Sequence, residues 1–408
     1  MTPRASSSVL TLNAGSSSLK FALFHLNEDW SEIARGKLDG IGKAQATLHL
    51  KVFSTKEEST SPVDASRLSA SLDAILKALF FWADPETLAG VGHRVVHGGP
   101  RFSSPEVVTE NLLAELRQLS PLDPDHLPAE IELIEAFQKR APRVPQIVCF
   151  DTAFHHHLPR IAQLLPLPRR YFEAGVRRYG FHGLSYQFLV EELHRSGDPV
   201  AKNGRLILAH LGNGASMAAV RDGQCVDTSM SFTPASGLVM SSRAGDLDPG
   251  LGAYLSRTEK MTPDQFNHLI NHESGLLGVS QISADMRVLL DREKSDTRAA
   301  DAVALFCYEA RKRMGAYAAV LGGVDTLVFA GGIGENCPEI RQRICEGLEF
   351  LGLCFDRTQN EKNSSVISTG DSRVRVRVMR TDEETVIARS AIAILKQESA
   401  SQFETLSL

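Results

Sequence analysis

The sequence VLTLNAGSSSLKFALF, residues 9–24, begins with an apolar run typical of a buried β-strand. Small residues from Asn13 to Ser18 interrupt the run, and Lys20 to Phe24 resumes it. Phosphate oxygens can approach such a turn closely, because no large side chain covers its backbone N–H groups. The stretch is therefore either an ordinary hairpin or a phosphate-binding loop. In the second case its candidate ligands are Asn13, Ser16, Ser18 and Lys20.

The same plan returns about half a chain later. Leu206 to Leu211 is an apolar run, Gly212 to Ser216 is a turn of small residues, and Met217 to Val220 resumes the strand. A further hairpin turn follows at residues 221–223. Two copies of one strand-turn-strand start predict a duplicated α/β unit that holds a ligand between its copies.

A third glycine-rich turn, Ala330 to Asn336, follows the apolar run Thr326 to Phe329 and precedes a helical pattern over Glu339 to Leu348. Glycine turns at helix starts can cradle a nucleotide. The turn is not a Walker A loop, because no Gly-Lys-Ser/Thr follows it.

Length and composition favour an enzyme with two domains. Domains usually hold about 100 to 200 residues, and the chain has 408, of which 43% are hydrophobic and 23% charged, with a net charge of -5. This profile predicts no nucleic-acid partner, and no apolar run reaches the roughly 20 residues that span a membrane. Six scattered cysteines without metal spacing predict reduced thiols and a cytoplasmic location. Helical patterns occur over residues 67–81, 129–139, 301–321 and 382–396.

Arginine and acidic residues beside small residues are the remaining candidates. Arg94 and Arg243 lie among glycine and small residues, so each is either part of a surface ion pair or a fork for a carboxylate or phosphate group. Asp151 follows an apolar run, and either it or Glu383 could hold a divalent ion. Glu383 is equally explained as a first-turn acid of a helix.

Taken together, the motifs resemble the acetate kinase (acetokinase) family, within the superfamily of acetate and sugar kinases, Hsp70 and actin. The resemblance covers nearly the whole chain in consistent order. It is carried by NAGSSSLKF, GHRVVHGG, FDTAFH, RRYGFHG, HLGNGAS, VDTSMSFTPASGL, SRAGDLDPG, ADMR, GGIGEN and TDEETVIA.

The resemblance implies a two-domain duplicated ribonuclease H-like (actin-like ATPase) α/β fold with the active site in the interdomain cleft. We place the first domain at residues 1–149 plus 383–408 and the second, with most of the nucleotide site, at 150–382. The implied activity is reversible phosphorylation of acetate by ATP through direct in-line transfer, with Mg²⁺, or Mn²⁺ in its place. Similar enzymes are homodimers.

The family's site residues carry over position by position. The catalytic residues would be Asp151, His182 and Arg243, and Arg94 would hold the acid. The apolar pocket for the methyl group would be Val96, Leu122, Phe181 and Pro234. The nucleotide would contact Lys20, His210, Leu211, Gly212, Asn213, Gly214, Asp285, Met286, Arg287, Gly332, Ile333, Gly334, Glu335 and Asn336. Asn13 and Glu383 would bind the metal ion.

Two departures from the family pattern lie near the expected acid site. The usual Thr-Ser-His after RRYGFHG is Leu184-Ser185-Tyr186, and the usual Leu-His-Asn-Pro is the shorter Leu122-Asp123-Pro124. Both bear on which acid is bound, so propionate or another short acid stays an alternative to acetate. A sugar kinase would share the phosphate loops but would not need a carboxylate fork at Arg94. A non-catalytic ATP-binding module of the Hsp70 type is a third alternative.

Overall fold

The computed structural model describes residues 8–15, 18–26, 31–43, 45–80, 82–84 and 88–406, with side chains up to residue 398. The chain forms two compact units: unit 1, residues 1–153 and 382–408, and unit 2, residues 154–381. The sequence predicts boundaries at 149/150 and 382/383. These predicted boundaries stay predictions. The turn after Phe150 bonds to unit 1, since Asp151 N–H donates to Val95 O at 2.9 Å.

Unit 1 is built on a mixed sheet with the strand order β5-β4-β3-β2-β1-β6-β8-β7. The first hairpin, β1 and β2, pairs antiparallel, whereas β1 pairs parallel with β6 and β6 parallel with β8. The polar stretch after Val52 supplies the exposed edge strand β5. The strand bounds are β1 Ser8–Ala14, β2 Ser18–His25, β3 Glu32–Asp39, β4 Ala46–Val52, β5 Glu58–Val63, β6 Gly90–Val95, β7 Glu106–Val107 and β8 Gln146–Phe150.

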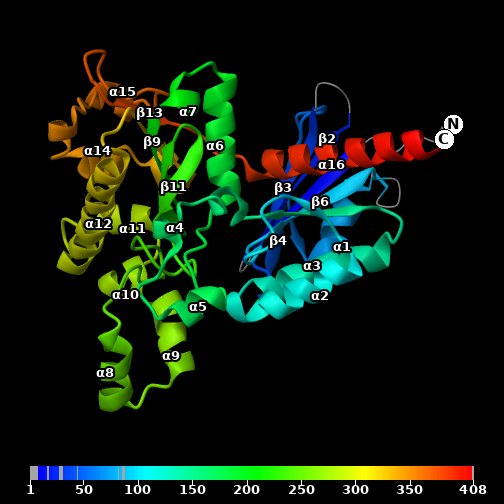
Figure 1. The fold of residues 1–408 in the computed structure, drawn as a ribbon, viewed down its shortest axis with the longest axis horizontal. Helices are drawn as coiled ribbons and strands as arrows, with labels where there is room; N and C mark the ends of the chain where they lie inside the picture. Colours follow the sequence, from blue (N-terminus) through cyan, green and yellow to red (C-terminus); the bar gives the residue numbers. More distant parts are fainter. Residues whose placement is uncertain are drawn as a thin grey trace. The chain divides into compact units, whose positions relative to one another are not determined.

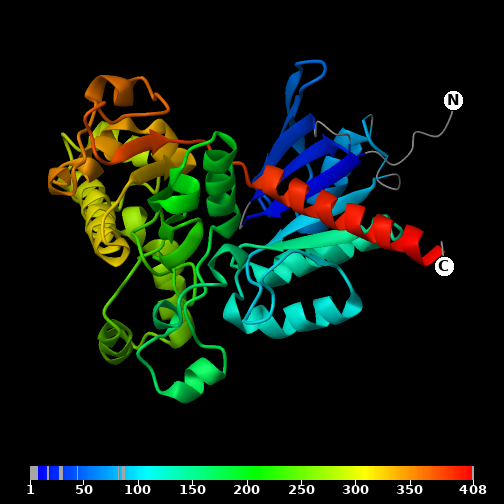
Figure 2. The ribbon, with the colours of Figure 1, turned by 45° about the horizontal axis from the view of Figure 1, so that its top comes forward.

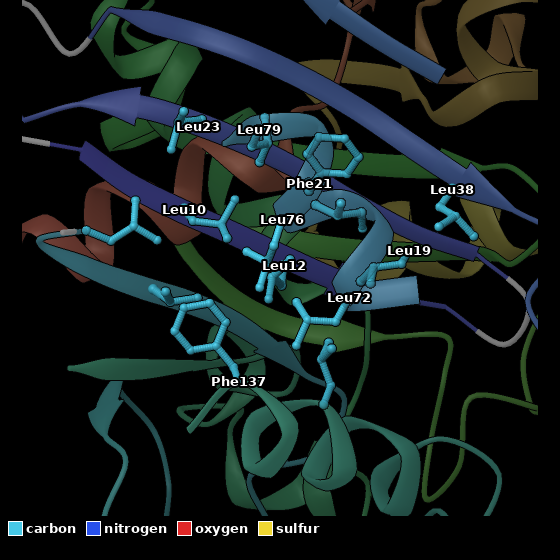
Figure 3. Close-up of a cluster of buried hydrophobic side chains, with 14 of the residues drawn as sticks. Leu10, Leu12, Leu19, Phe21, Leu23, Leu38, Leu72, Leu76, Leu79 and Phe137 are labelled. Atoms are coloured by element: carbon cyan, nitrogen blue, oxygen red, sulfur yellow. The ribbon is translucent and has the colours of Figure 1, made fainter. Parts of the chain in front are cut away.

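Helices cover both faces of this sheet (Figure 1). On one side are α1 (Leu68–Leu79), α2 (Glu110–Leu119) and α3 (Leu127–Arg140), and on the other is α16 (Glu383–Leu406). Successive side chains of a strand point to opposite faces. Leu10 and Leu12 accordingly join the core with Phe137 of α3 (Figure 3), whereas Val9 packs with Ala391 of α16.

Unit 2 repeats the pairing of unit 1. Its sheet has the order β11-β10-β9-β12-β13, in which β9 and β10 are antiparallel, and β12 runs parallel to both β9 and β13. The segment β3-β2-β1-β6-β8 of unit 1 has the same directions. The predicted duplication is therefore confirmed. The bounds are β9 Arg205–Leu211, β10 Ala215–Arg221, β11 Gln224–Thr228, β12 Thr326–Ala330 and β13 Arg375–Val378.

Most of the rest of unit 2 is helical, with the long α12 prominent in Figure 2. The helices are α4 Arg160–Gln163, α5 Arg169–Glu173, α6 Gly183–Arg195, α7 Val200–Asn203, α8 Gly250–Glu259, α9 Pro263–His268, α10 Gly275–Ser280, α11 Met286–Arg292, α12 Thr297–Leu321, α13 Gly331–Asn336, α14 Pro338–Cys345 and α15 Arg357–Glu361. The glycine-rich stretch after β12 is thus a short helix, α13, whereas the sequence predicted a turn.

The helical patterns correspond to α1, α3, α12 and α16, with bounds that differ at their ends. All six cysteines are free. Among the described residues, no helix combines the length and apolar character needed to cross a membrane.

Glycines on β6 allow α16 to approach the sheet closely. A Cβ atom at Gly92 would lie 2.4 Å from Ile387 Cγ2, and one at Gly90 would lie 2.7 Å from Leu395 Cδ1. Ile387 is completely buried. The absence of side chains at these two positions therefore sets the distance between the last helix and the sheet.

Replacing Gly92 by Ala should destabilise the protein by about 1 to 3 kcal/mol, because the helix has to shift to relieve the overlap. Gly315→Ala in α12 is the control, since its added Cβ meets no heavy atom within 4 Å. Ala there should stabilise the helix by about 0.5 to 1 kcal/mol. Urea unfolding checks both changes, and an unchanged midpoint for Gly92→Ala would contradict the packing argument.

Candidate active site

Three predicted site residues of unit 1, a metal ligand, the acid-binding arginine and a catalytic carboxylate, lie where neighbouring parallel strands end. Asn13 is near the end of β1, Arg94 near the end of β6, and Asp151 directly follows β8. Because these strands run in one direction, their carboxyl ends meet at one edge of the sheet, where ligands bind in α/β sheets.

Carboxylates from the start of α16 gather around the first hairpin. Asn13 lies opposite Lys20 in the β1–β2 register, and its Nδ2 donates to Glu383 Oε2 at 2.8 Å and to Glu384 Oε1 at 3.0 Å. Burial lowers the pKa of Lys20, but the charges of Glu383 and Glu384 outweigh it and raise the pKa above its ordinary value. Ser16 lies outside the described residues.

This arrangement suits a divalent cation. Such an ion prefers oxygen ligands and often takes only one or two protein ligands beside phosphates and water. The side chains of Asn13 and Glu383, which contact each other here, are the candidate protein ligands of such an ion. Within the described part of the chain, no group of three or more His, Cys, Asp or Glu side chains could hold a metal ion alone.

Arg94 is held from two sides by buried carboxylates. Its Nη2 donates to Asp151 Oδ2 at 3.1 Å, and its Nη1 donates to Glu130 Oε1 at 3.0 Å and to the Ala14 carbonyl at 3.3 Å. Burial opposes the charge of Arg94, but Asp151 and Glu130 more than compensate and raise its pKa. Arg94 is therefore a fixed, permanently charged fork.

The sequence reasoning missed Glu130. It lies on the apolar stripe of α3, beside Leu127, Ile131 and Ile134, and is itself buried. Burial raises the pKa of Glu130 to about 7, although Arg94 and the Val96 N–H act in the opposite direction. The sequence did hold a signal of a buried acid, because Glu130 occupies a position where the helical period calls for an apolar residue.

The predicted acid pocket has polar neighbours in unit 1. Val96 is buried, and its N–H donates to Glu130 Oε2 at 2.8 Å. Leu122 is half-buried in the 3₁₀ turn Ser120–Leu122, next to buried Asp123, whose Oδ1 bonds to His126 Nδ1 at 2.8 Å. The other two predicted pocket residues, Phe181 and Pro234, belong to unit 2.

In unit 2 a chain of hydroxyl groups holds His182. Its Nδ1 is 2.8 Å from Ser216 Oγ, which in turn bonds to the hydroxyl of the fully buried Tyr186. The ring of His182 stacks on that of His210, with centroids 4.3 Å apart. His210 Nδ1 bonds to Ser185 Oγ at 2.8 Å. Two of the predicted histidines are thus brought together and their rings are fixed.

Gly214, in the second hairpin, is where His182 and Arg243 meet. A Cβ atom there would lie 3.1 Å from His182 Nε2 and 3.7 Å from Arg243 Nη1. Arg243 Nη1 also donates to the Pro234 carbonyl at 3.3 Å. A glycine at this position lets two nitrogen-bearing side chains converge on exposed backbone.

The second hairpin also lies close to α13. A Cβ atom at Gly212 would be 3.8 Å from the backbone nitrogen of Gly332, and Gly331 adopts a φ of 76° against the Leu211 carbonyl. Glu335 Oε1 accepts from Gly331 N–H at 3.1 Å. The structure therefore brings the predicted nucleotide residues of the hairpin and of α13 together.

A buried arginine hydrogen-bonds to the backbone of α13. Arg341 is fully buried, and its Nη1 donates to the carbonyls of Gly334 at 2.8 Å and Glu335 at 3.0 Å. Burial lowers its pKa to about 10.

The predicted nucleotide residues at the start of α11 are arranged differently. Asp285 and Arg287 pair with each other at 2.6 Å on an exposed surface, while Met286 is buried.

Comparisons with known proteins agree with this chemistry. A sequence model of the Acetokinase family matches residues 8–389. An acetate kinase of Methylocella silvestris is 45% identical, over 96% of this chain and 99% of its own. A propionate kinase of Citrobacter rodentium is 42% identical, over 96% and 98%. The crystal structure of Porphyromonas gingivalis acetate kinase has a TM-score of 0.85 and 37% identity, covering 95% of this chain and 100% of its own.

Proposed function

Because the chain belongs to the acetokinase family, we propose that this kinase transfers the γ-phosphoryl group of ATP to acetate, reversibly, giving acetyl phosphate and ADP. The observation that carries the proposal is Arg94, a buried guanidinium fixed by Glu130 and Asp151 at the carboxyl end of β6. A planar guanidinium can bind a carboxylate through two parallel hydrogen bonds, whereas binding of a single sugar hydroxyl does not require this geometry.

The reaction needs positioning and charge neutralisation more than proton transfer. A carboxylate oxygen of the acid attacks the γ-phosphorus, and the bond from that phosphorus to the bridging oxygen of ADP breaks. The acid is already ionised near neutral pH, since carboxyl groups have pKa values of about 4 to 5. No general base is required, and no proton changes place in this step.

Positive and hydrogen-bonding groups would stabilise the transferring phosphoryl group. In this proposal His182 Nε2 and Arg243 Nη1, which converge at Gly214, contact its equatorial oxygens. Lys20 contacts the nucleotide phosphates. A divalent ion, proposed to be Mg²⁺ or Mn²⁺ on Asn13 and Glu383, supplies further neutralisation of the phosphate charge when bound.

Asp151 acts in this account as a positioning group. It is buried, fixed by its backbone to Val95 and by its side chain to Arg94 at 3.1 Å. Since the acid needs no base, we assign Asp151 to the orientation of Arg94 and of the metal ion with its water molecules, not to proton transfer.

The nucleotide residues proposed in unit 2 are those of the hairpin at 210–214, of α13 and of Asp285 to Arg287. Support comes from the approach of Gly212 to Gly332 and from the small residues that leave backbone groups exposed. Propionate is the alternative acid, since relatives of both names match over nearly the whole chain. One methylene changes binding by only about 1 to 3 kcal/mol. A homodimer and a cytoplasmic location stay predictions.

Trapping the product with hydroxylamine tests the function. The enzyme with ATP, Mg²⁺ and formate, acetate, propionate or butyrate in turn should give acyl hydroxamate, most rapidly with acetate. Faster reaction with propionate would favour the alternative. No hydroxamate from any of the four acids would contradict the proposal, and ATP hydrolysis without acid serves as the background.

Tyr186→Phe should lower kcat about three- to tenfold with unchanged KM values, because the lost hydroxyl leaves Ser216 and then His182 less firmly oriented. The ring still fills its buried space. Tyr308→Phe, on an exposed face of α12, is the matched control. Steady-state kinetics check the change, and an unchanged kcat in Tyr186→Phe would show that this hydroxyl does not support catalysis.

A further inference from the structure

We propose that Glu130 is the positioning residue of the acid site: its carboxylate fixes the guanidinium of Arg94 and the backbone of Val96, so that the free edge of Arg94 receives the acid. The inference rests on the proposed function, because it deepens the role given to Arg94. None of the sequence motifs includes Glu130.

The two oxygens of Glu130 are divided between two parts of the acid site. Oε1 accepts from Arg94 Nη1 at 3.0 Å, and Oε2 accepts from the Val96 N–H at 2.8 Å. Arg94 and Val96 lie on either side of Val95, where β6 ends. A single carboxylate on α3 thus fixes both the charged fork and the first residue of the predicted apolar wall.

The donors of Arg94 indicate which edge is left for the substrate. Its guanidinium has five N–H groups, and Nη1 uses its two on Glu130 and Ala14, while Nη2 uses one on Asp151. Nε makes no hydrogen bond to any residue in the described ranges. The Nε and Nη2 edge can therefore accept a carboxylate in the bidentate manner that arginine favours.

The contacts of Glu130 with Arg94 and Val96, called the clamp from here on, are buried. The side chain of Glu130 is 3% exposed and that of Arg94 is 14% exposed, so water cannot readily replace the carboxylate. Without Glu130, Nη1 would lose a buried hydrogen-bond partner, and the guanidinium would be free to turn toward Asp151. The edge offered to the acid would then change orientation, and small misplacements in a site cost much affinity and rate.

If Glu130 had a different role, its removal would change the affinity for the acid in the opposite direction. If its negative charge only weakened the attraction of Arg94 for an anion, its removal would strengthen acid binding. The clamp predicts weaker binding instead. The sign of the change in acid affinity therefore separates positioning from simple charge compensation.

The experiment compares the wild type with Glu130→Ala, Glu130→Gln and Glu132→Ala, the last being an exposed acid of the same helix. In Glu130→Ala the KM for acetate should rise at least about tenfold, with the KM for ATP within about twofold. Glu130→Gln should be intermediate, because the amide keeps one acceptor oxygen but presents an NH₂ group, itself a donor, to the other donor. Glu132→Ala should match the wild type.

Acetate binding is also read without turnover, as the rise in melting temperature that acetate produces. Glu130→Ala should lose most of that rise. An unchanged or lower KM for acetate, or an equal rise in the KM for ATP, would overturn the proposal. If Glu130→Ala does not fold, Glu130→Gln is judged by the same criteria. A wild type that acetate stabilises but that forms no acyl phosphate refutes the proposed function and leaves the clamp testable by binding.

Discussion

The parallel pairing of β1 with β6 and of β9 with β12 is the constraint on which the rest of the structure depends. Parallel neighbours place their carboxyl ends at one edge of a sheet. In unit 1 this brings Asn13, Arg94 and Asp151 to one edge, and in unit 2 it places the second hairpin beside α13. Each unit thus repeats one topology and uses the same edge for its candidate chemistry.

Charge compensation then decides what the edge of unit 1 can bind. A buried cation is stable only when it is paired and hydrogen-bonded, and Arg94 obtains this from Glu130 and Asp151. The two carboxylates remove its freedom to move without using all of its donors. If Arg94 holds the acid as proposed, fixing the guanidinium in advance lowers the ordering cost of binding that anion. Unit 2 uses neutral partners instead, since His182 is held by the hydroxyls of Ser216 and Tyr186.

Much of this organisation could be predicted from the sequence, for reasons that differ between features. The hairpins and the duplication follow from local patterns of apolar and small residues, so they were predictable from the sequence. The glycine-rich helix α13 was not, because glycine turns and short helices share the same composition. Glu130 was missed because its partners, Arg94 and Val96, are distant in sequence, and a glutamate in an amphipathic helix is usually exposed. The Tyr186 departure was visible, but its bond to Ser216 depends on packing.

In the proposed reaction, the carboxylate of the acid is the group that takes the phosphoryl group. Phosphorus NMR of the product formed from ATP and acetate labelled with ¹⁸O in its carboxylate tests this most directly. Direct transfer should give acyl phosphate in which one ¹⁸O atom bridges carbon and phosphorus, seen as an isotope shift of the phosphorus signal. Release of inorganic phosphate from ATP without ¹⁸O on phosphorus, and without an acyl phosphate signal, would contradict it.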